Sequence, residues 1–144
     1  MARGGVVEEV EMRAVLLCVA MVVGQGLLQD APKTTEGKAD AGEAAKLVNP
    51  VKSTAVSLAS GKKTYGTDCA MCHGKAGAGD GDLAVDMKLT LKDYRDPEAL
   101  KGMTDGEIYQ VIAKGKGQMS GEEGRMKPAQ VWDVVNYVRS LAKK

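Results

Sequence analysis

The residues of this chain best suited to chemistry are two cysteines and a histidine in one short stretch, Cys69-Ala70-Met71-Cys72-His73. The C-x-x-C-H pattern is typical of a covalent haem c attachment site. Two thiols at this spacing can add to the two vinyl groups of one haem, and the adjacent histidine can ligate the iron. His73 is the only histidine in the sequence, so the assignment requires no choice among several candidates. We therefore predict one covalently bound haem c per chain, held by Cys69 and Cys72, with His73 as an iron ligand.

Two other kinds of site also use paired cysteines. A redox dithiol is expected within a thioredoxin-like strand-helix-strand unit, and the sequence around Cys69 shows no such pattern. A structural zinc site requires about four nitrogen or sulfur ligands, and the only further cysteine, Cys18, lies in an apolar N-terminal run. Both alternatives are therefore weaker than haem attachment.

The composition favours a small domain built around a large apolar group. The chain has 144 residues, no Phe, four Tyr and one Trp, so it lacks the bulky side chains that usually fill a core. A buried porphyrin would supply the missing apolar volume, and we expect the apoprotein to fold poorly without it. The formal net charge of +1 argues against nucleic-acid binding as the main task.

The N-terminal residues 1–29 have the pattern of a targeting segment. Residues 14–28 form an almost uncharged apolar run. This run is short for a membrane span of about 20 residues and fits the hydrophobic region of a signal peptide, which is about 7–15 residues long. We predict a signal peptide, with an uncleaved N-terminal membrane anchor as the alternative. Either one implies a periplasmic protein, free or tethered to the membrane. Met12 is an alternative start to Met1, because acidic residues precede it.

Residues 30–56 are predicted to form a flexible linker or an extended segment laid over the domain. The segment is rich in Ala, Lys, Thr, Glu and Gly, contains Pro32 and Pro50, and has little apolar periodicity. Residues 39–48 alone have a weak pattern for a short helix. The functional domain is predicted to span residues 57–144.

Three helices are predicted in that domain, and no segment shows sustained strand alternation. Ser57 is the expected N-cap of a first helix, which runs to about Thr67 and leads into the cysteine motif. Thr104 and Glu107 form a capping box at the start of a second helix. Pro128 suits the first turn of a third helix, whose apolar residues repeat at helical spacing. These apolar residues are Val131, Val134, Val135, Val138 and Leu141. The predicted fold class is therefore all-α with long irregular connections.

Together these features resemble the class I cytochromes c, in particular the small bacterial members with one haem, over residues 57–144. Besides the C-x-x-C-H motif, the resemblance rests on a Gly and an aromatic residue in the first helix, an aromatic residue in the last helix, and a glycine-rich loop with a methionine. These are Gly61, Tyr65, Tyr137 and the segment Gly115-Lys116-Gly117-Gln118-Met119. The resemblance implies a small cytochrome c-like helical domain wrapped around the haem, in which Gly61 lets the first and last helices cross at close range.

The resemblance also implies that Met119 is the second axial ligand of the iron, with His73 as the first. A thioether ligand favours ferrous iron and raises the reduction potential. Met126, just before the last helix, is the main competitor, although packing in the core is the simpler role for it. The family often has Pro and then an aromatic residue after this methionine, whereas Ser120-Gly121-Glu122 follows here. We therefore expect a wetter haem edge and a lower potential than in a sealed site.

The predicted function is one-electron transfer in a periplasmic or membrane-associated respiratory chain, and not enzymatic catalysis. The expected partners are redox proteins, such as a membrane oxidoreductase or a terminal oxidase. No nucleic-acid partner is expected, and contact with a membrane is expected only through an uncleaved N-terminal segment. Two alternatives stay open: a haem c enzyme or gas-binding protein with an open distal site, and an electron-entry module of a larger oxidoreductase. The first would have to work without a second histidine for acid-base chemistry.

Overall fold

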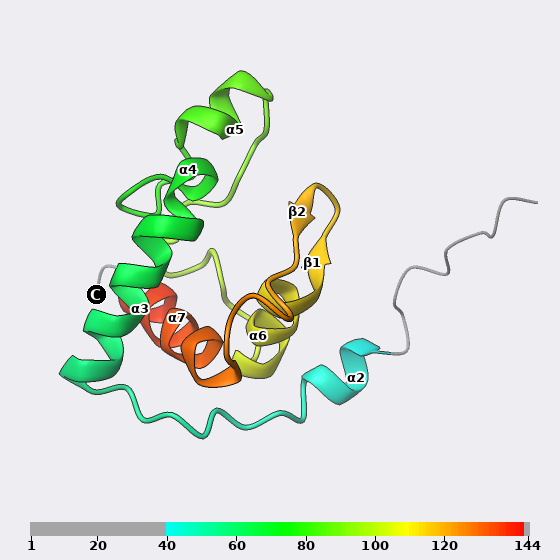
Figure 1. The fold of residues 1–144 in the computed structure, drawn as a ribbon. Helices are drawn as coiled ribbons and strands as arrows, with labels where there is room; N and C mark the ends of the chain where they lie inside the picture. The colour runs from blue at the N-terminus through cyan, green and yellow to red at the C-terminus, as the bar shows by residue number, and fades with distance from the viewer. Residues whose placement is uncertain (1–39, 143–144) are drawn as a thin grey trace, which may run out of the picture. The chain divides into compact units, whose positions relative to one another are not determined.

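A computed structural model describes residues 40–142 of the chain. In chain order, its elements are α2 (Asp40–Ala44), α3 (Ala55–Asp68), α4 (Ala70–His73), α5 (Asp82–Asp86), α6 (Asp105–Lys114), β1 (Gly115–Lys116), β2 (Met119–Ser120) and α7 (Pro128–Ser140). The described part of the chain is helical apart from one two-stranded hairpin, so the all-α prediction is confirmed (Figure 1). The predicted leader, residues 1–29, and residues 30–39 of the predicted linker lie outside the described residues.

The frame of the fold is the contact between α3 and α7, which cross at close range (Figure 1). At the crossing point, Gly61 of α3 is buried against the backbone of α7. A Cβ atom on Gly61 would lie 2.0 Å from the carbonyl oxygen of Asp133 and 2.8 Å from Tyr137 Cβ. Tyr65, one turn further along α3, packs edge-on against Tyr137, with ring centroids 5.2 Å apart. The close approach of the first and last helices at Gly61, predicted from the sequence, is confirmed.

Most of the apolar core comes from α7. Four of the five residues in its predicted stripe are buried, each with 5% or less of its surface exposed. They are Val131, Val134, Val135 and Val138. Facing them, α6 buries Ile108 and Ile112, and its Tyr109 stacks on Trp132 of α7 with ring centroids 4.3 Å apart. The two helices therefore form a continuous apolar wall.

Two of the predicted helix starts are confirmed. The Thr104 hydroxyl accepts a hydrogen bond from the Glu107 N–H, and the Glu107 carboxylate accepts one from the Thr104 N–H, which completes the capping box of α6. Pro128 occupies the first turn of α7. There its lack of an N–H costs nothing, because that position has no partner within the helix.

The predicted N-cap of the first helix is wrong. The helix begins at Ala55, and Thr54 is the cap: its hydroxyl accepts a hydrogen bond from the Ser57 N–H. Ser57 is instead buried at the helix crossing, where its hydroxyl donates to the Asp133 carboxylate at 2.6 Å and accepts from the Asn136 amide at 2.9 Å. A serine that suits an N-cap by type is therefore used to join α3 to α7.

The sequence did not predict α4, α5 or the β1–β2 hairpin. The two helices have four and five residues and the strands two each, which is too short for hydrophobic periodicity to develop. In the hairpin, Gly115 pairs with Ser120 and Lys116 pairs with Met119. The predicted methionine loop is thus a tight hairpin that directly follows α6.

Residues 40–56, the described part of the predicted linker, lie over α6 and α7. Ala44 is 3% exposed, and a Cβ on Gly106 of α6 would lie 2.0 Å from its carbonyl oxygen. The Asn49 amide donates to Asn136 Oδ1 at 2.9 Å, and the Asn136 amide donates to the Val51 carbonyl at 3.0 Å. In this part the chain adopts the second of the two predicted arrangements, laid over the domain. The boundary of the functional domain at residue 57 stays a prediction.

The close crossing at Gly61 generates a prediction about stability. Gly61→Ala should destabilise the protein by about 1–3 kcal/mol or more, because the added methyl group forces α3 away from the α7 backbone. Gly66→Ala in the same helix is the matched control, since a Cβ there meets nothing within 4 Å; it should stabilise α3 by about 0.5–1 kcal/mol. Denaturant unfolding of both haem-loaded variants measures the two effects. Equal changes in the free energy of unfolding of the two variants would contradict the claim that the close approach at Gly61 determines the helix crossing.

Candidate haem site

The C-x-x-C-H motif lies where α3 ends and the single turn of α4 begins. Cys69 is the C-cap of α3, and its N–H donates to the Tyr65 carbonyl. The Cys69 carbonyl in turn accepts hydrogen bonds from the Cys72 and His73 N–H groups, at 3.2 and 2.9 Å. This turn places both thiols and the imidazole at the C-terminal end of α3. It ends at Gly74, whose φ of +77° is in the left-handed region that favours glycine.

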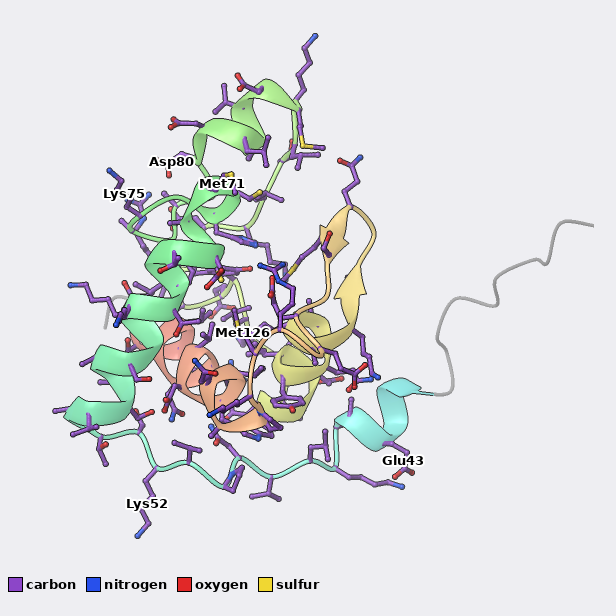
Figure 2. All side chains as sticks on the ribbon, viewed as in Figure 1. Glu43, Lys52, Met71, Lys75, Asp80 and Met126 are labelled. Atoms are coloured by element: carbon purple, nitrogen blue, oxygen red, sulfur yellow. The ribbon has the colours of Figure 1, made fainter. Side chains whose placement is uncertain are left out.

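The glycine-rich turn after the motif folds back against it. The Gly79 N–H donates to the His73 carbonyl at 2.8 Å, and the Gly81 N–H donates to the Cys72 carbonyl at 3.1 Å. A Cβ on Gly81 would lie 2.3 Å from the Met71 carbonyl oxygen, so only glycine fits there. Met71 itself belongs to α4 and is 57% exposed (Figure 2). These bonds fix the backbone of the cysteine motif from two sides.

An apolar cavity of about 760 Å³, counting its open mouth, adjoins the motif. Cys69 and His73 line one side of the cavity, and the apolar wall of α6 and α7 lines another. The wall residues are Ile108, Val111, Ile112, Val134 and Val138. The thiol and imidazole of the motif therefore face a space suited to a large apolar group.

His73 has the properties of a metal ligand. Burial lowers the pKa of His73, which favours the neutral imidazole, the form that binds a metal. Its Nδ1 atom is buried and has no hydrogen-bond partner among the described residues. Tyr94 stacks on the imidazole with ring centroids 5.2 Å apart and 25° between the planes. The Tyr94 N–H donates to the Gly77 carbonyl at 2.7 Å, which anchors this aromatic ring to the glycine turn.

The surroundings of Cys69 disfavour the two alternative uses of the cysteine pair. Burial raises the pKa of Cys69 to about 12, with smaller contributions from the charges of Asp68, Glu122 and Cys72. A redox dithiol needs a reactive thiolate, which this environment suppresses. Within residues 40–142 no group of three or more His, Cys, Asp or Glu side chains is arranged to hold a metal ion, so a zinc site lacks ligands there.

The structure separates the candidate methionines. Met119 lines the same cavity as His73, presented by β2 of the hairpin. Met126, the competitor, lines a different, polar groove beside α3 (Figure 2 labels it in the loop before α7). Met103, at the entry to α6, also lines the His73 cavity. The cavity thus brings together His73, Met119 and Met103, and not Met126.

Sequence reasoning also missed Tyr94 and Lys92, which line the cavity from the connection between α5 and α6. No periodic pattern marks this connection, and a backbone hydrogen bond from Tyr94 to Gly77 helps to hold it beside the glycine turn. The single signal is that Tyr94 is one of only four tyrosines in a chain without Phe.

Comparison with known proteins agrees with this geometry. A family model described as Cytochrome c matches residues 58–142. The chain belongs to the cytochrome c family. Cytochrome c6 of Limnospira maxima is 33% identical over 90 residues, covering 60% of this chain and 96% of that protein. A cbb3-type cytochrome c oxidase subunit FixP of Bradyrhizobium is 33% identical over 99 residues. The match covers 61% of this chain but only 31% of that subunit.

Solved structures give the same fold. A protein titled KustC0563 c-type cytochrome has a TM-score of 0.51 and 27% identity, covering 58% of this cytochrome and 98% of that chain. A reducing HAO-like protein complex of Kuenenia stuttgartiensis has a TM-score of 0.56 at 23% identity, covering 65% of this chain and 47% of the other. This second similarity supports the fold alone.

As a class I monohaem c-type cytochrome, the chain binds one haem c covalently. The cavity fits this cofactor, because it combines apolar walls with a neutral buried imidazole and a thioether. No helix within residues 40–142 is long and apolar enough to cross a membrane.

Tyr65 joins the helix frame to the cysteine motif, and this generates a second prediction. Its hydroxyl donates to the buried Gly74 carbonyl at 3.0 Å, and burial raises the pKa of Tyr65, so the phenol stays protonated and able to donate. Tyr65→Phe should lower the free energy of unfolding by about 1–3 kcal/mol, because it leaves this carbonyl without a partner.

Tyr109→Phe is the matched control for Tyr65→Phe, because the Tyr109 hydroxyl makes no hydrogen bond with the residues described. Tyr109→Phe should lower the free energy of unfolding by about 0.5 kcal/mol or less. Thermal unfolding of the two haem-loaded variants compares them. A cost for Tyr65→Phe no larger than the control would show that this bond contributes nothing to holding the motif.

Proposed function

We propose that this cytochrome is a one-electron carrier whose haem is bound to Cys69 and Cys72 and whose iron is ligated by His73 and Met119. The observation that carries the proposal is that His73 and Met119 line the same apolar cavity. Two axial protein ligands leave no open position for a substrate, which suits electron transfer. When bound, the haem supplies the one-electron chemistry, and the protein sets its potential and limits its exposure.

Each protein group has a separate task in this arrangement. His73 offers a neutral imidazole, and Tyr94 limits the rotation of that ring by stacking on it. Met119 offers its thioether from the β1–β2 hairpin, which can close only because position 115 is glycine. Gly115 has a φ of +82°, and a Cβ there would lie 2.3 Å from the Met119 carbonyl oxygen. The apolar wall of α6 and α7 excludes water from the side facing the core.

The identity of the sulfur ligand can be tested by replacing each of three methionines with leucine in turn. Met119→Leu should abolish the far-red sulfur-to-iron absorption band of the ferric protein and let the ferrous protein bind carbon monoxide, because leucine cannot ligate iron. Met103→Leu, in the same cavity, and Met126→Leu, in the polar groove, should both keep the band. Each swap conserves volume and should cost less than about 1.5 kcal/mol in stability. Loss of the band in Met103→Leu or Met126→Leu would show that the substituted methionine, and not Met119, is the sulfur ligand.

The proposed setting is a periplasmic or membrane-associated respiratory chain, with residues 1–29 as the exporting signal or anchor and residues 30–56 as the connection to the domain. A membrane oxidoreductase or a terminal oxidase is the proposed partner. The similarity to FixP, a cytochrome c oxidase subunit, supports an oxidase as the class of partner. Covalent haem c and an apolar leader both fit assembly outside the cytoplasm.

This setting predicts where the mature protein accumulates. When the full chain is expressed in a bacterium that matures c-type cytochromes, haem-staining protein should be found in the periplasmic or membrane fraction. Deleting residues 1–29 should abolish haem attachment, because the domain then stays in the cytoplasm. Haem-loaded protein in the cytoplasmic fraction, or full loading of the truncated chain, would contradict the proposed export.

A second candidate function is an electron-entry module of a larger oxidoreductase. The observation that favours it is the FixP similarity, in which this cytochrome spans about 31% of a longer oxidase subunit. Both functions need the same ligands, so they differ in partner and not in site. Stable co-purification with a membrane oxidoreductase would favour the module, and recovery of a freely exchanging monomer would favour the carrier.

A further inference from the structure

Glu122, three residues after Met119, is a buried charged group with incomplete compensation. The residue is 9% exposed. Its backbone is fixed on both sides: its N–H donates to the Ile112 carbonyl at 3.0 Å, and its carbonyl accepts from the Met126 N–H at 2.9 Å. Its carboxylate oxygen Oε2 is buried and has no hydrogen-bond partner among the described residues. A buried carboxylate oxygen without a hydrogen bond lowers the stability of the folded protein. We therefore expect Glu122 to have a function that offsets this loss.

Arg125 forms an ion pair with this carboxylate and compensates its charge only in part. Its Nη1 atom lies 3.4 Å from each Glu122 carboxylate oxygen, which is long for a charge-assisted hydrogen bond of about 2.7–2.9 Å. The Arg125 side chain is 65% exposed, and its Nη2 lies 3.8 Å from the Asp68 carboxylate. Water therefore screens the arginine far more than the glutamate, and the arginine is shared between two acids.

Glu122 lines the same polar groove as Asp68, the residue directly before the predicted attachment cysteine Cys69. Glu122 and Asp68 both contribute to the raised pKa of Cys69, after burial itself. The same two acids line the polar groove beside α3, together with Thr64 and Thr67. The backbone hydrogen bond between Glu122 and Ile112 joins this loop to α6. Ile112 itself lines the apolar cavity. Glu122 thus lies between the groove and the haem cavity.

We propose that Glu122 sets the reduction potential of the haem, by placing a buried negative charge beside the Cys69 end of the cofactor. This inference rests on the proposed function. The oxidised haem carries one more positive charge than the reduced haem, so a nearby carboxylate stabilises the oxidised form and lowers the potential. Burial strengthens the effect, because the charge is poorly screened by water. A lower potential directs electrons from this cytochrome toward partners of higher potential.

The adjacent residue provides a matched control. Glu123 carries the same charge, but its side chain is 65% exposed and forms an ion pair with Lys114. We expect Glu122→Gln to raise the reduction potential of the haem. The equilibrium constant for electron exchange with a fixed mediator should change by about tenfold in this variant, and by about twofold or less in Glu123→Gln. Spectroelectrochemical titration of the purified haem-loaded proteins measures both shifts. Equal shifts, or no shift for Glu122→Gln, would overturn the proposal.

Arg125→Gln tests the sign of the effect and keeps the proposal testable if Glu122→Gln does not mature. Removing the exposed arginine leaves the Glu122 charge less compensated, so the potential should fall. An unchanged or raised potential in the single Arg125→Gln variant would contradict the proposed role of Glu122.

Failure of this inference is distinguishable from failure of the proposed function. A wrong ligand assignment is detected in the absorption spectrum of the unmodified protein and of Met119→Leu, before any potential is measured. The glutamate variants should keep the spectrum of the unmodified protein, with only the potential changed. If the spectrum changes in Glu122→Gln and not in Glu123→Gln, Glu122 acts on the hairpin that holds Met119, and the electrostatic proposal is rejected.

Discussion

The close contact between α3 and α7 at Gly61 is the constraint on which the rest of the structure depends. Because no side chain separates the two helices there, the end of α3 has a fixed position relative to the apolar face of α7. That end carries Cys69 and leads into His73, while the facing helix carries Val134 and Val138. One glycine therefore sets the distance between the attachment motif and the wall of the cofactor cavity.

Polar contacts reinforce this crossing where apolar packing alone would let the helices slide. Ser57, Asp133 and Asn136 form a connected set of hydrogen bonds between the helices, and Asn136 also binds the segment around Asn49 and Val51. Buried polar groups specify one arrangement when all of them find partners. The segment that enters the domain is thus attached to the same helix that forms the cavity wall. Its position over α6 and α7 follows from side-chain bonds and not from secondary structure.

Sequence reasoning identified the parts of the site that have a chemical signature, namely the C-x-x-C-H motif, the Thr104–Glu107 cap and the valine stripe of α7. It failed where tertiary contacts override local preference. Ser57 is a good N-cap by type, but a buried partner at Asp133 determines its role. Tyr94 and Met103 belong to irregular connections whose path depends on long-range contacts, so no local pattern predicted their place in the cavity. The ligand roles of His73 and Met119 stay predictions, supported by a shared cavity.

The central claim is that a haem bound in this cavity has two protein ligands, one nitrogen and one sulfur. The most direct test is the absorption spectrum of the purified mature protein, oxidised and reduced, with and without carbon monoxide. Ligation by His73 and Met119 predicts a low-spin spectrum with the far-red sulfur-to-iron band in the ferric state and no change in the ferrous state on adding carbon monoxide. A high-spin ferrous spectrum that shifts fully with carbon monoxide would contradict it, and would favour a gas-binding or catalytic haem with an open distal site.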